Sequence, residues 1–260
     1  MDKLTLKRGS QVLAPSLFTM GNMACGFYSI VASGREDFTA AATAILGGIV
    51  FDGLDGRVAR MVRGESVFGV EFDSLADFLS FGAAPAYMMY ALILKDLGAL
   101  GVACAFLFAL CGALRLARFN VSAQAKTGSK SHFQGLPIPA GAGFLASFVL
   151  LYEILEQQKP AHTLSLLMRE VPAMIALGPL VMVFLSFLMV STIPYAAFKQ
   201  KDVFQGKNKR LVALAAAGLL VIYFYPENAV FLFILMYVLS GLVGLLGRSR
   251  SKDGQDAPAS

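Results

Sequence analysis

The sequence contains no tryptophan, only three cysteines and only two histidines. The cysteines lie in apolar stretches without a CxxC pair, which is typical of small core residues rather than of metal ligands. They are Cys25, Cys104 and Cys111. So few sulfur and imidazole groups do not favour a zinc or copper centre. Without tryptophan, the anchors at a membrane interface must be tyrosine, phenylalanine and basic flanking residues.

Charged residues are also scarce. They make up 15% of the sequence and hydrophobic residues 57%, against about 25% and about 45–50% in soluble domains. Apolar stretches of about 20 residues recur, which predicts an all-α, polytopic integral membrane bundle and argues against a soluble helical core. About eight transmembrane helices are expected, at residues 13–33, 38–61, 73–94, 99–118, 138–156, 173–196, 211–225 and 229–247.

The predicted helices leave no room for a separate soluble domain, so residues 1–247 are expected to form a single transmembrane domain. Residues 1–12 would be its juxtamembrane segment, and the polar tail 248–260 is predicted to be disordered. A cytoplasmic N-terminus places all but four of the 22 lysines and arginines on the cytosolic side. The positive-inside rule therefore predicts that the N-terminus lies inside. A bacterial-type cytoplasmic (inner) membrane, with the site facing the cytosol, is the expected location.

Four aspartates lie at the cytosolic ends of the predicted second and third helices. Asp52 and Asp55 are three residues apart and Asp73 and Asp77 are four apart, so each pair shares one helix face. Residues 63–66, Arg-Gly-Glu-Ser, predict a break between two antiparallel helices, which would bring the four carboxylates together. Acids in such apolar sequence are costly and could not all ionise side by side, so they indicate a functional site with a cationic partner.

The sequence around these acids suits a hard metal ion and a phosphorylated ligand. Oxygen ligands without His or Cys favour magnesium, manganese or calcium. Two carboxylate pairs could hold two ions about 4 Å apart, as in enzymes of in-line displacement at phosphorus. Gly53, Gly56 and Ala59 leave the helix surface bare for a ligand, and Arg60 could bind a phosphate. Ser66 could cap the next helix or donate to a phosphate oxygen.

Of two structural interpretations of the stretch, one is excluded and one stays open. An EF-hand loop does not fit, because the third and fifth positions counted from Asp52 are Leu54 and Gly56 rather than acids. An ion-pair cluster would need only the aspartates and the nearby basic residues, which are Arg57, Arg60 and Arg63.

The stretch from Asp52 to Asp77 resembles, position by position, the signature of the CDP-alcohol phosphotransferase family, D-x2-D-G-x2-A-R-x8-G-x3-D-x3-D. Every fixed position is present: Asp52, Asp55, Gly56, Ala59, Arg60, Gly69, Asp73 and Asp77. Further segments resemble the phosphatidylserine synthase branch of this family, at residues 15–22, 72–82, 114–120 and 135–139. The resemblance extends over about residues 13–200.

The resemblance implies transfer of a phosphatidyl group from CDP-diacylglycerol to the hydroxyl of L-serine, giving phosphatidylserine and CMP. It also implies two divalent ions, Mg²⁺ or Mn²⁺, in an in-line displacement. Asp52, Asp55 and Asp73 would hold the first ion, and Asp73 and Asp77 the second. Asp77 would also be the general base toward the serine hydroxyl, with help from metal polarisation because a carboxylate is a weak base for an alcohol.

By the same resemblance, residues near the aspartates would bind the donor. Gly56, Ala59 and Arg60 would bind its CMP part, and Ser66 and Gly69 would support its phosphates. Asn22 in the first helix, with Thr19 in support, would either contact the nucleotide or bond a neighbouring helix.

The end of the predicted fourth helix has two interpretations. Arg115, Arg118 and Asn120 are either a basic flank of a membrane helix or a site for an anionic group of the acceptor or of a lipid phosphate. The core signature does not distinguish acceptors, so glycerol 3-phosphate and inositol phosphate remain alternatives to serine.

Membrane lipids and a second copy of the chain, in a homodimer, are the expected partners beside the substrates, and no nucleic acid is expected. A divalent-cation transporter is an alternative of another class, because acidic pairs in membrane helices also suit cation flux. The acids gather at one side, whereas a transporter site belongs near the middle of the membrane, so the enzyme is favoured.

Overall fold

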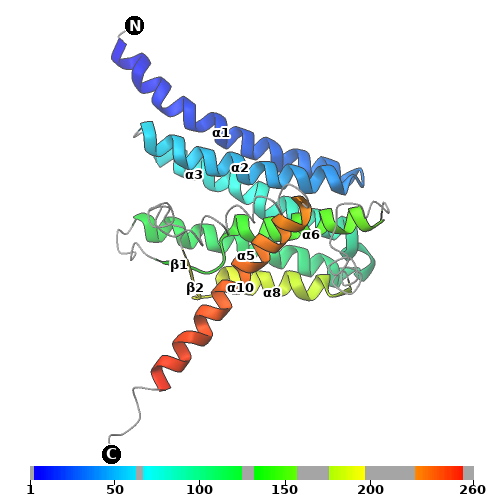
Figure 1. Ribbon diagram of the computed structural model, residues 1–260. Coiled ribbons are helices and arrows are strands. Elements are labelled where there is room, and N and C mark those ends of the chain that lie inside the picture. Colours follow the sequence, from blue (N-terminus) through cyan, green and yellow to red (C-terminus); the bar gives the residue numbers. More distant parts are fainter. Residues whose placement is uncertain (1–2, 63–66, 125–131, 157–175, 197–225, 254–260) are drawn as a thin grey trace, which may run out of the picture.

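The computed structural model describes residues 3–62, 67–124, 132–156, 176–196 and 226–253 (Figure 1). Within these ranges the chain is helical, as expected, apart from turns and one short ribbon. The main helices are α1 (Lys3–Gly34), α2 (Phe38–Val62), α3 (Val67–Asp77), α5 (Ala99–Gln124), α6 (Ile138–Glu156), α8 (Gly178–Val190) and α10 (Pro226–Asp253). Most run roughly parallel to one another, and α10 crosses them obliquely (Figure 1).

Three helical segments in the described part of the chain are long and apolar enough to cross a membrane: Phe38–Val58, Phe68–Leu97 and Ala99–Ser122. Shorter apolar helices occupy Ile138–Ile154, Gly178–Val190 and Asn228–Gly241. Large apolar side chains on the outside are more than half exposed, as a hydrocarbon solvent permits, among them Leu100, Phe106 and Phe187. The predicted helix at 211–225 lies outside the described residues, so the total of eight stays a prediction.

The third membrane helix is one rod that changes its helical pitch. After α3 it continues through η1 (Phe78–Ala83), α4 (Ala84–Met89), η2 (Tyr90–Leu94) and η3 (Lys95–Leu97). Its first change is a π-helical turn, η1, which begins directly after Asp77. Such wide turns are rare and occur often at functional sites. The predicted break at 63–66 lies outside the described residues.

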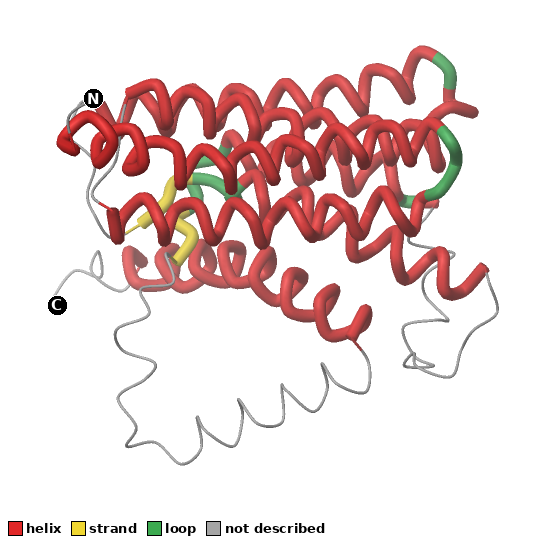
Figure 2. Tube along the Cα trace, turned by 90° about the horizontal axis from the view of Figure 1, so that it is seen from above, coloured by secondary structure: helices red, strands yellow, loops and turns green. Residues whose placement is uncertain are grey.

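Helix α6 forms the centre of the bundle. Its residues from Gly141 to Val149 are all buried, and it contacts both α2 and α10. Figure 2 shows most helices of the bundle side by side, with the ribbon toward one end. A helix apolar all round must be buried in protein or in lipid, and α6 is covered by its neighbours.

Helix α1 approaches the bundle closely at two glycines. A Cβ atom added to Gly26 would lie 2.6 Å from the Cα of Ser80 in η1, which no side chain permits. A Cβ atom added to Gly48 of α2 would lie 3.0 Å from Asn22 Oδ1. The two contacts fix the height and rotation of α1 against the helices that carry the aspartates.

Two strands, β1 (His132–Gln134) and β2 (Pro194–Ala196), pair antiparallel with Phe133 opposite Tyr195. The sequence did not predict this ribbon. It was expected that the sixth helix would reach residue 196, but α8 ends at Val190, because Pro194 cannot donate to a helix and restricts the residue before it. Gly135, with a φ of 81°, then turns the chain toward α6, and its amide donates to the Ile193 carbonyl at 2.9 Å.

Candidate active site

The aspartates of α2 and α3 converge. One oxygen each of Asp52, Asp73 and Asp77 lies within 4.8 Å of the other two, and all three residues are partly buried. Helical spacing places the acids of each pair on one face, and the packing of the two helices turns these faces toward each other. We call this set the carboxylate group.

Asp55 lies beside the carboxylate group and has a partner of its own. It is 6% exposed, and its Oδ2 accepts a hydrogen bond from the Thr19 hydroxyl of α1. Its Oδ1 is buried without a hydrogen-bond partner in the described part of the protein. Asp55 therefore presents one unused oxygen.

Asn22 of α1, the helix that also carries Thr19, holds Asp77 in place. The fully buried Asn22 amide donates to Asp77 Oδ1 at 3.0 Å, and its backbone carbonyl accepts a hydrogen bond of 2.8 Å from the Ser80 hydroxyl. Thr19 thus donates to an aspartate of the α2 pair, and Asn22 donates to an aspartate of the α3 pair. Both bond neighbouring helices, which is one of the two interpretations that the sequence left open for Asn22.

Among the described residues, Arg115 of α5 is a cation that faces the acids. Its guanidinium is close enough to Asp77 and Asp52 to interact with their charges. Its Nε is buried and has no hydrogen-bond partner among the described residues. Its single charge offsets the charge of the carboxylates only in part, and the unpaired Nε leaves a donor for an anionic ligand.

The other two residues at the end of α5 bond protein groups. Arg118 donates from Nη1 to the Val190 carbonyl at the end of α8, at 3.2 Å. Asn120 donates from Nδ2 to Ser74 Oγ at 2.9 Å, which holds α3 next to Asp73. These contacts brace the helices around the carboxylate group.

Four of the remaining predicted donor-binding residues, Gly56, Ala59, Arg60 and Gly69, lie in α2 or α3. A Cβ atom added to Gly53 or Gly56 would meet no atom of the described residues within 4 Å. Gly69 is in the first turn of α3 and partly buried. Ala59 and Arg60 lie in α2 but their side chains are outside the description, and Ser66 lies outside the described residues.

Sequence reasoning missed Tyr237 of α10. This partly buried side chain interacts electrostatically with Arg115, and its ring centroid is 5.7 Å from that of Tyr195. The Tyr195 hydroxyl in turn donates to the Val238 carbonyl at 3.3 Å. A hydroxyl-bearing residue in an apolar predicted helix was the available signal, but the contact spans residues far apart in the chain.

The donor set fits a hard divalent ion. Asp52, Asp73 and Asp77 supply closely spaced oxygens, and the buried Oδ1 atoms of Asp55 and Asp73 have no hydrogen-bond partner in the described chain. Buried carboxylates at this spacing repel one another unless a cation lies between them. All-oxygen coordination of this kind suits Mg²⁺ or Mn²⁺.

These observations define a helical protein with membrane-spanning segments and a carboxylate site suited to divalent ions. The model of the CDP-alcohol phosphatidyltransferase family matches residues 12–171, which include all four aspartates. The chain belongs to this family, so the resemblance found in the sequence is confirmed. Membership of a family that synthesises lipids and the presence of long apolar helices together indicate that the chain is a membrane protein.

Several curated proteins are similar to this chain. A CDP-diacylglycerol–serine O-phosphatidyltransferase of Helicobacter pylori is 36% identical over 234 residues, which cover 89% of this chain and 90% of that protein. A protein of the same name from Bacillus subtilis is 32% identical over 186 residues, covering 72% and 91%. An archaetidylserine synthase of Methanothermobacter thermautotrophicus is 40% identical over 143 residues, covering 54% and 59%.

Proposed function

We propose that this chain transfers the phosphatidyl group of CDP-diacylglycerol to the hydroxyl of L-serine, giving phosphatidylserine and CMP. The observation that carries the proposal is the carboxylate group of Asp52, Asp73 and Asp77 in a member of the CDP-alcohol phosphatidyltransferase family. Serine as acceptor is supported by the names of the Helicobacter and Bacillus relatives, which align with most of the chain.

The proposed metal ligands follow the pairs of acids. Asp52, Asp55 and Asp73 would hold one divalent ion, and Asp73 and Asp77 a second, with Mg²⁺ or Mn²⁺ as the metal. When bound, the ions neutralise charge on the pyrophosphate and lower the pKa of the attacking hydroxyl. The unpaired Oδ1 atoms of Asp55 and Asp73 support these assignments.

Asp77 is the proposed base. Its Oδ1 is held by Asn22, which leaves Oδ2 to accept the proton of the serine hydroxyl. The serine oxygen then forms a bond to the phosphorus that carries diacylglycerol. The bond from this phosphorus to the oxygen that bridges to CMP breaks, and CMP leaves with that oxygen.

Arg115 is the proposed contact for an anionic group. Its buried Nε has no partner in the described residues, and a guanidinium matches both carboxylate and phosphate geometry. It would bind the serine carboxylate or a donor phosphate. The same chemistry would accept glycerol 3-phosphate or inositol phosphate, so the acceptor is decided by experiment.

The remaining donor contacts and the setting in the membrane are part of the proposal. Gly56, Ala59, Arg60, Ser66 and Gly69 would bind the CDP moiety, over the open surface that α2 presents at its glycines. The bundle would have about eight spans with the N-terminus and the site on the cytosolic side of a bacterial-type inner membrane. It would act as a homodimer.

The test is CMP release by the purified protein from CDP-diacylglycerol with serine, glycerol 3-phosphate or inositol phosphate, with Mg²⁺ or Mn²⁺ present. We expect release with serine and its loss in Asp77→Asn. Asp96→Asn is the matched control, because Asp96 is an exposed acid on the same rod. Release with another acceptor instead of serine would change the assignment. Cation flux into vesicles without nucleotide would favour a transporter.

A further inference from the structure

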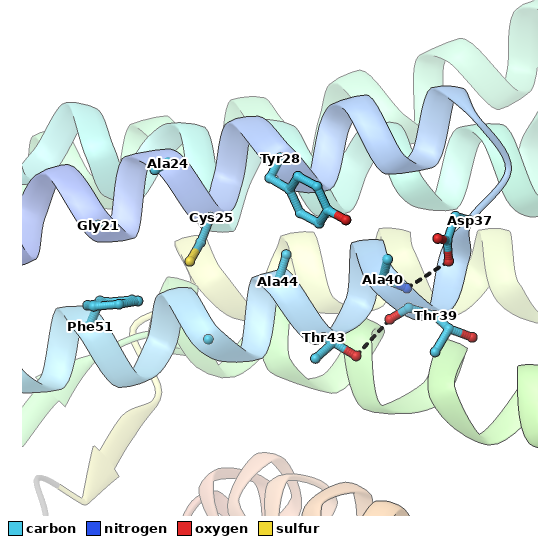
Figure 3. A pocket seen from close by; sticks show the side chains of 11 residues that line it. Gly21, Ala24, Cys25, Tyr28, Asp37, Thr39, Ala40, Thr43, Ala44 and Phe51 are labelled. Atoms are coloured by element: carbon cyan, nitrogen blue, oxygen red, sulfur yellow. Dashed lines mark hydrogen bonds between the residues drawn. The ribbon is translucent and has the colours of Figure 1, made fainter.

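A groove between α1 and α2 and a contact between α10 and α5 both lie outside the proposed chemistry. The groove has a volume of about 820 Å³, and Figure 3 shows Cys25 and Tyr28 of α1 and Ala44 of α2 pointing into the space between the two helices. The residues that line it belong to α1, α2 and the turn between them. The contact is separate from the groove, because it joins Tyr237 of α10 to Arg115 of α5.

Helix α10 lies beyond the residues that the family model matches, yet it brings a side chain to the candidate active site. Tyr237 is partly buried and interacts electrostatically with Arg115. The same guanidinium interacts with the charges of Asp77 and Asp52. Tyr237 is therefore linked to the proposed base, Asp77, through a single side chain.

The β-ribbon fixes the position of Tyr237. Tyr195 of β2 is fully buried, and its ring centroid is 5.7 Å from that of Tyr237. Its hydroxyl donates to the carbonyl of the next residue of α10, Val238, at 3.3 Å. A Cβ atom added to Gly241 would lie 2.3 Å from the Tyr195 ring, so the glycine lets α10 pack directly against this ring. The ring contact and the hydrogen bond together fix the height and rotation of α10 at Tyr237.

The Arg115 side chain needs such a partner. A guanidinium uses its planar fork of donors only when the fork faces the anion, and a long side chain on one helix can point in several directions. The Nε of Arg115 is buried and has no hydrogen-bond partner among the described residues. Tyr237 restricts the guanidinium from a helix that carries no proposed metal ligand.

The geometry of in-line displacement decides which substrate Arg115 meets. The attacking and leaving oxygens lie on opposite sides of the phosphorus. The proposed contacts for CMP at residues 56–60 belong to α2, whereas Asp77 belongs to α3 and Arg115 to α5. The acceptor therefore enters on the side of Asp77 and Arg115, where the guanidinium meets the carboxylate of serine rather than a donor phosphate.

We propose that Tyr237 is a positioning residue for the acceptor, which orients the Arg115 guanidinium toward the carboxylate of serine. The proposal rests on the proposed function and adds a residue of α10 to the acceptor site. A carboxylate carries one negative charge, which one guanidinium matches, whereas a phosphate monoester carries about −1.5 to −2. Because a phenol adds no positive charge beside Arg115, the pair favours serine over glycerol 3-phosphate.

The test separates the KM values of the two substrates in Tyr237→Phe, by CMP release. Loss of the hydroxyl should raise KM for serine about three- to tenfold. It should change kcat and KM for CDP-diacylglycerol less than about twofold, whereas a merely structural role would affect serine and donor alike. Tyr87→Phe is the matched control, because Tyr87 is an exposed tyrosine of α4, and it should leave both KM values unchanged.

A second variant moves Tyr237 without replacing it. Gly241→Ala places a Cβ atom against the Tyr195 ring, which displaces α10, and it should also raise KM for serine with little change in KM for the donor. An unchanged KM for serine in both variants, or a rise confined to KM for the donor, would overturn the inference and leave the proposed function intact. A wild-type protein that releases no CMP with serine would overturn both.

Discussion

Replacing Asn22 with leucine tests how Asp77 is held. The substitution keeps the volume of the side chain but removes the amide that donates to Asp77 Oδ1 at 3.0 Å. Asn22 Oδ1 is buried without a partner in the described chain, so leucine also removes one unpaired atom. We therefore expect a small change in thermal stability and a large change in activity.

The size of the effect follows from the charge of the acceptor. A hydrogen bond to a charged group contributes about 1.5–3 kcal/mol, and about 1.4 kcal/mol corresponds to a factor of ten in rate. Asn22→Leu should therefore lower kcat between about tenfold and about a hundredfold. Ser80→Ala is the matched control, because it removes a neutral hydrogen bond to the Asn22 carbonyl and should cost less than about tenfold.

The assay is CMP release at saturating metal, with kcat and KM for the donor measured separately. A fall in kcat with little change in KM is expected if Asn22 orients the base. A rise in KM alone would mean that Asn22 binds the nucleotide, and would refute the argument from the Asp77 contact. So would a folded Asn22→Leu protein with kcat within threefold of the wild type.

Three further predictions concern the packing of α1, the last helix and the metal. Gly26→Ala should lower the melting temperature markedly, because its Cβ would lie 2.6 Å from a backbone atom of η1. Gly53→Ala is the control and should leave the melting temperature unchanged, because its Cβ would meet no atom of the described residues within 4 Å. Equal melting temperatures of the two variants would contradict the close approach of Gly26. Tyr237→Phe should lower kcat/KM about three- to tenfold, because it removes the hydroxyl that interacts with Arg115. Tyr195→Phe should have less effect, because the Tyr195 hydroxyl bonds the backbone of α10. In an Arg115→Lys background, Tyr237→Phe should no longer lower kcat/KM. Mn²⁺ should raise the melting temperature of the wild type in a thermal-shift assay, and Asp73→Asn should abolish that rise; an undiminished rise would remove Asp73 from the metal site.

The convergence of the acids could be predicted because it depends on local geometry. Spacings of three and four place Asp52 with Asp55 and Asp73 with Asp77 on single helix faces, and the short connection at 63–66 makes the two helices neighbours. Three of the four carboxylates do lie together. That Asp55 turns toward Thr19 depends on the packing of α1, which no spacing in α2 reveals.

Contacts between distant helices were not predictable from periodicity. The position of Asn22 beside Asp77 is set by the approach of Gly26 to Ser80, and single-sequence patterns contain no such information on helix rotation. The same holds for Tyr237, which interacts electrostatically with Arg115 although the two residues are far apart in the sequence. The β-ribbon also joins distant segments, and a three-residue strand leaves too little alternation to be recognised.

The π-helical turn after Asp77 has a consequence for the length of this segment. An α-helix rotates by about 100° for each residue, and η1 accommodates an extra residue between the aspartates and the lower half of the rod. Inserting one more residue between Phe78 and Ala83 would therefore swing one half of the rod against the other and point Asp73 and Asp77 away from α2, whereas deleting one would return the turn to an α-helix. Single-residue insertions in this turn should be far more damaging than single-residue deletions there.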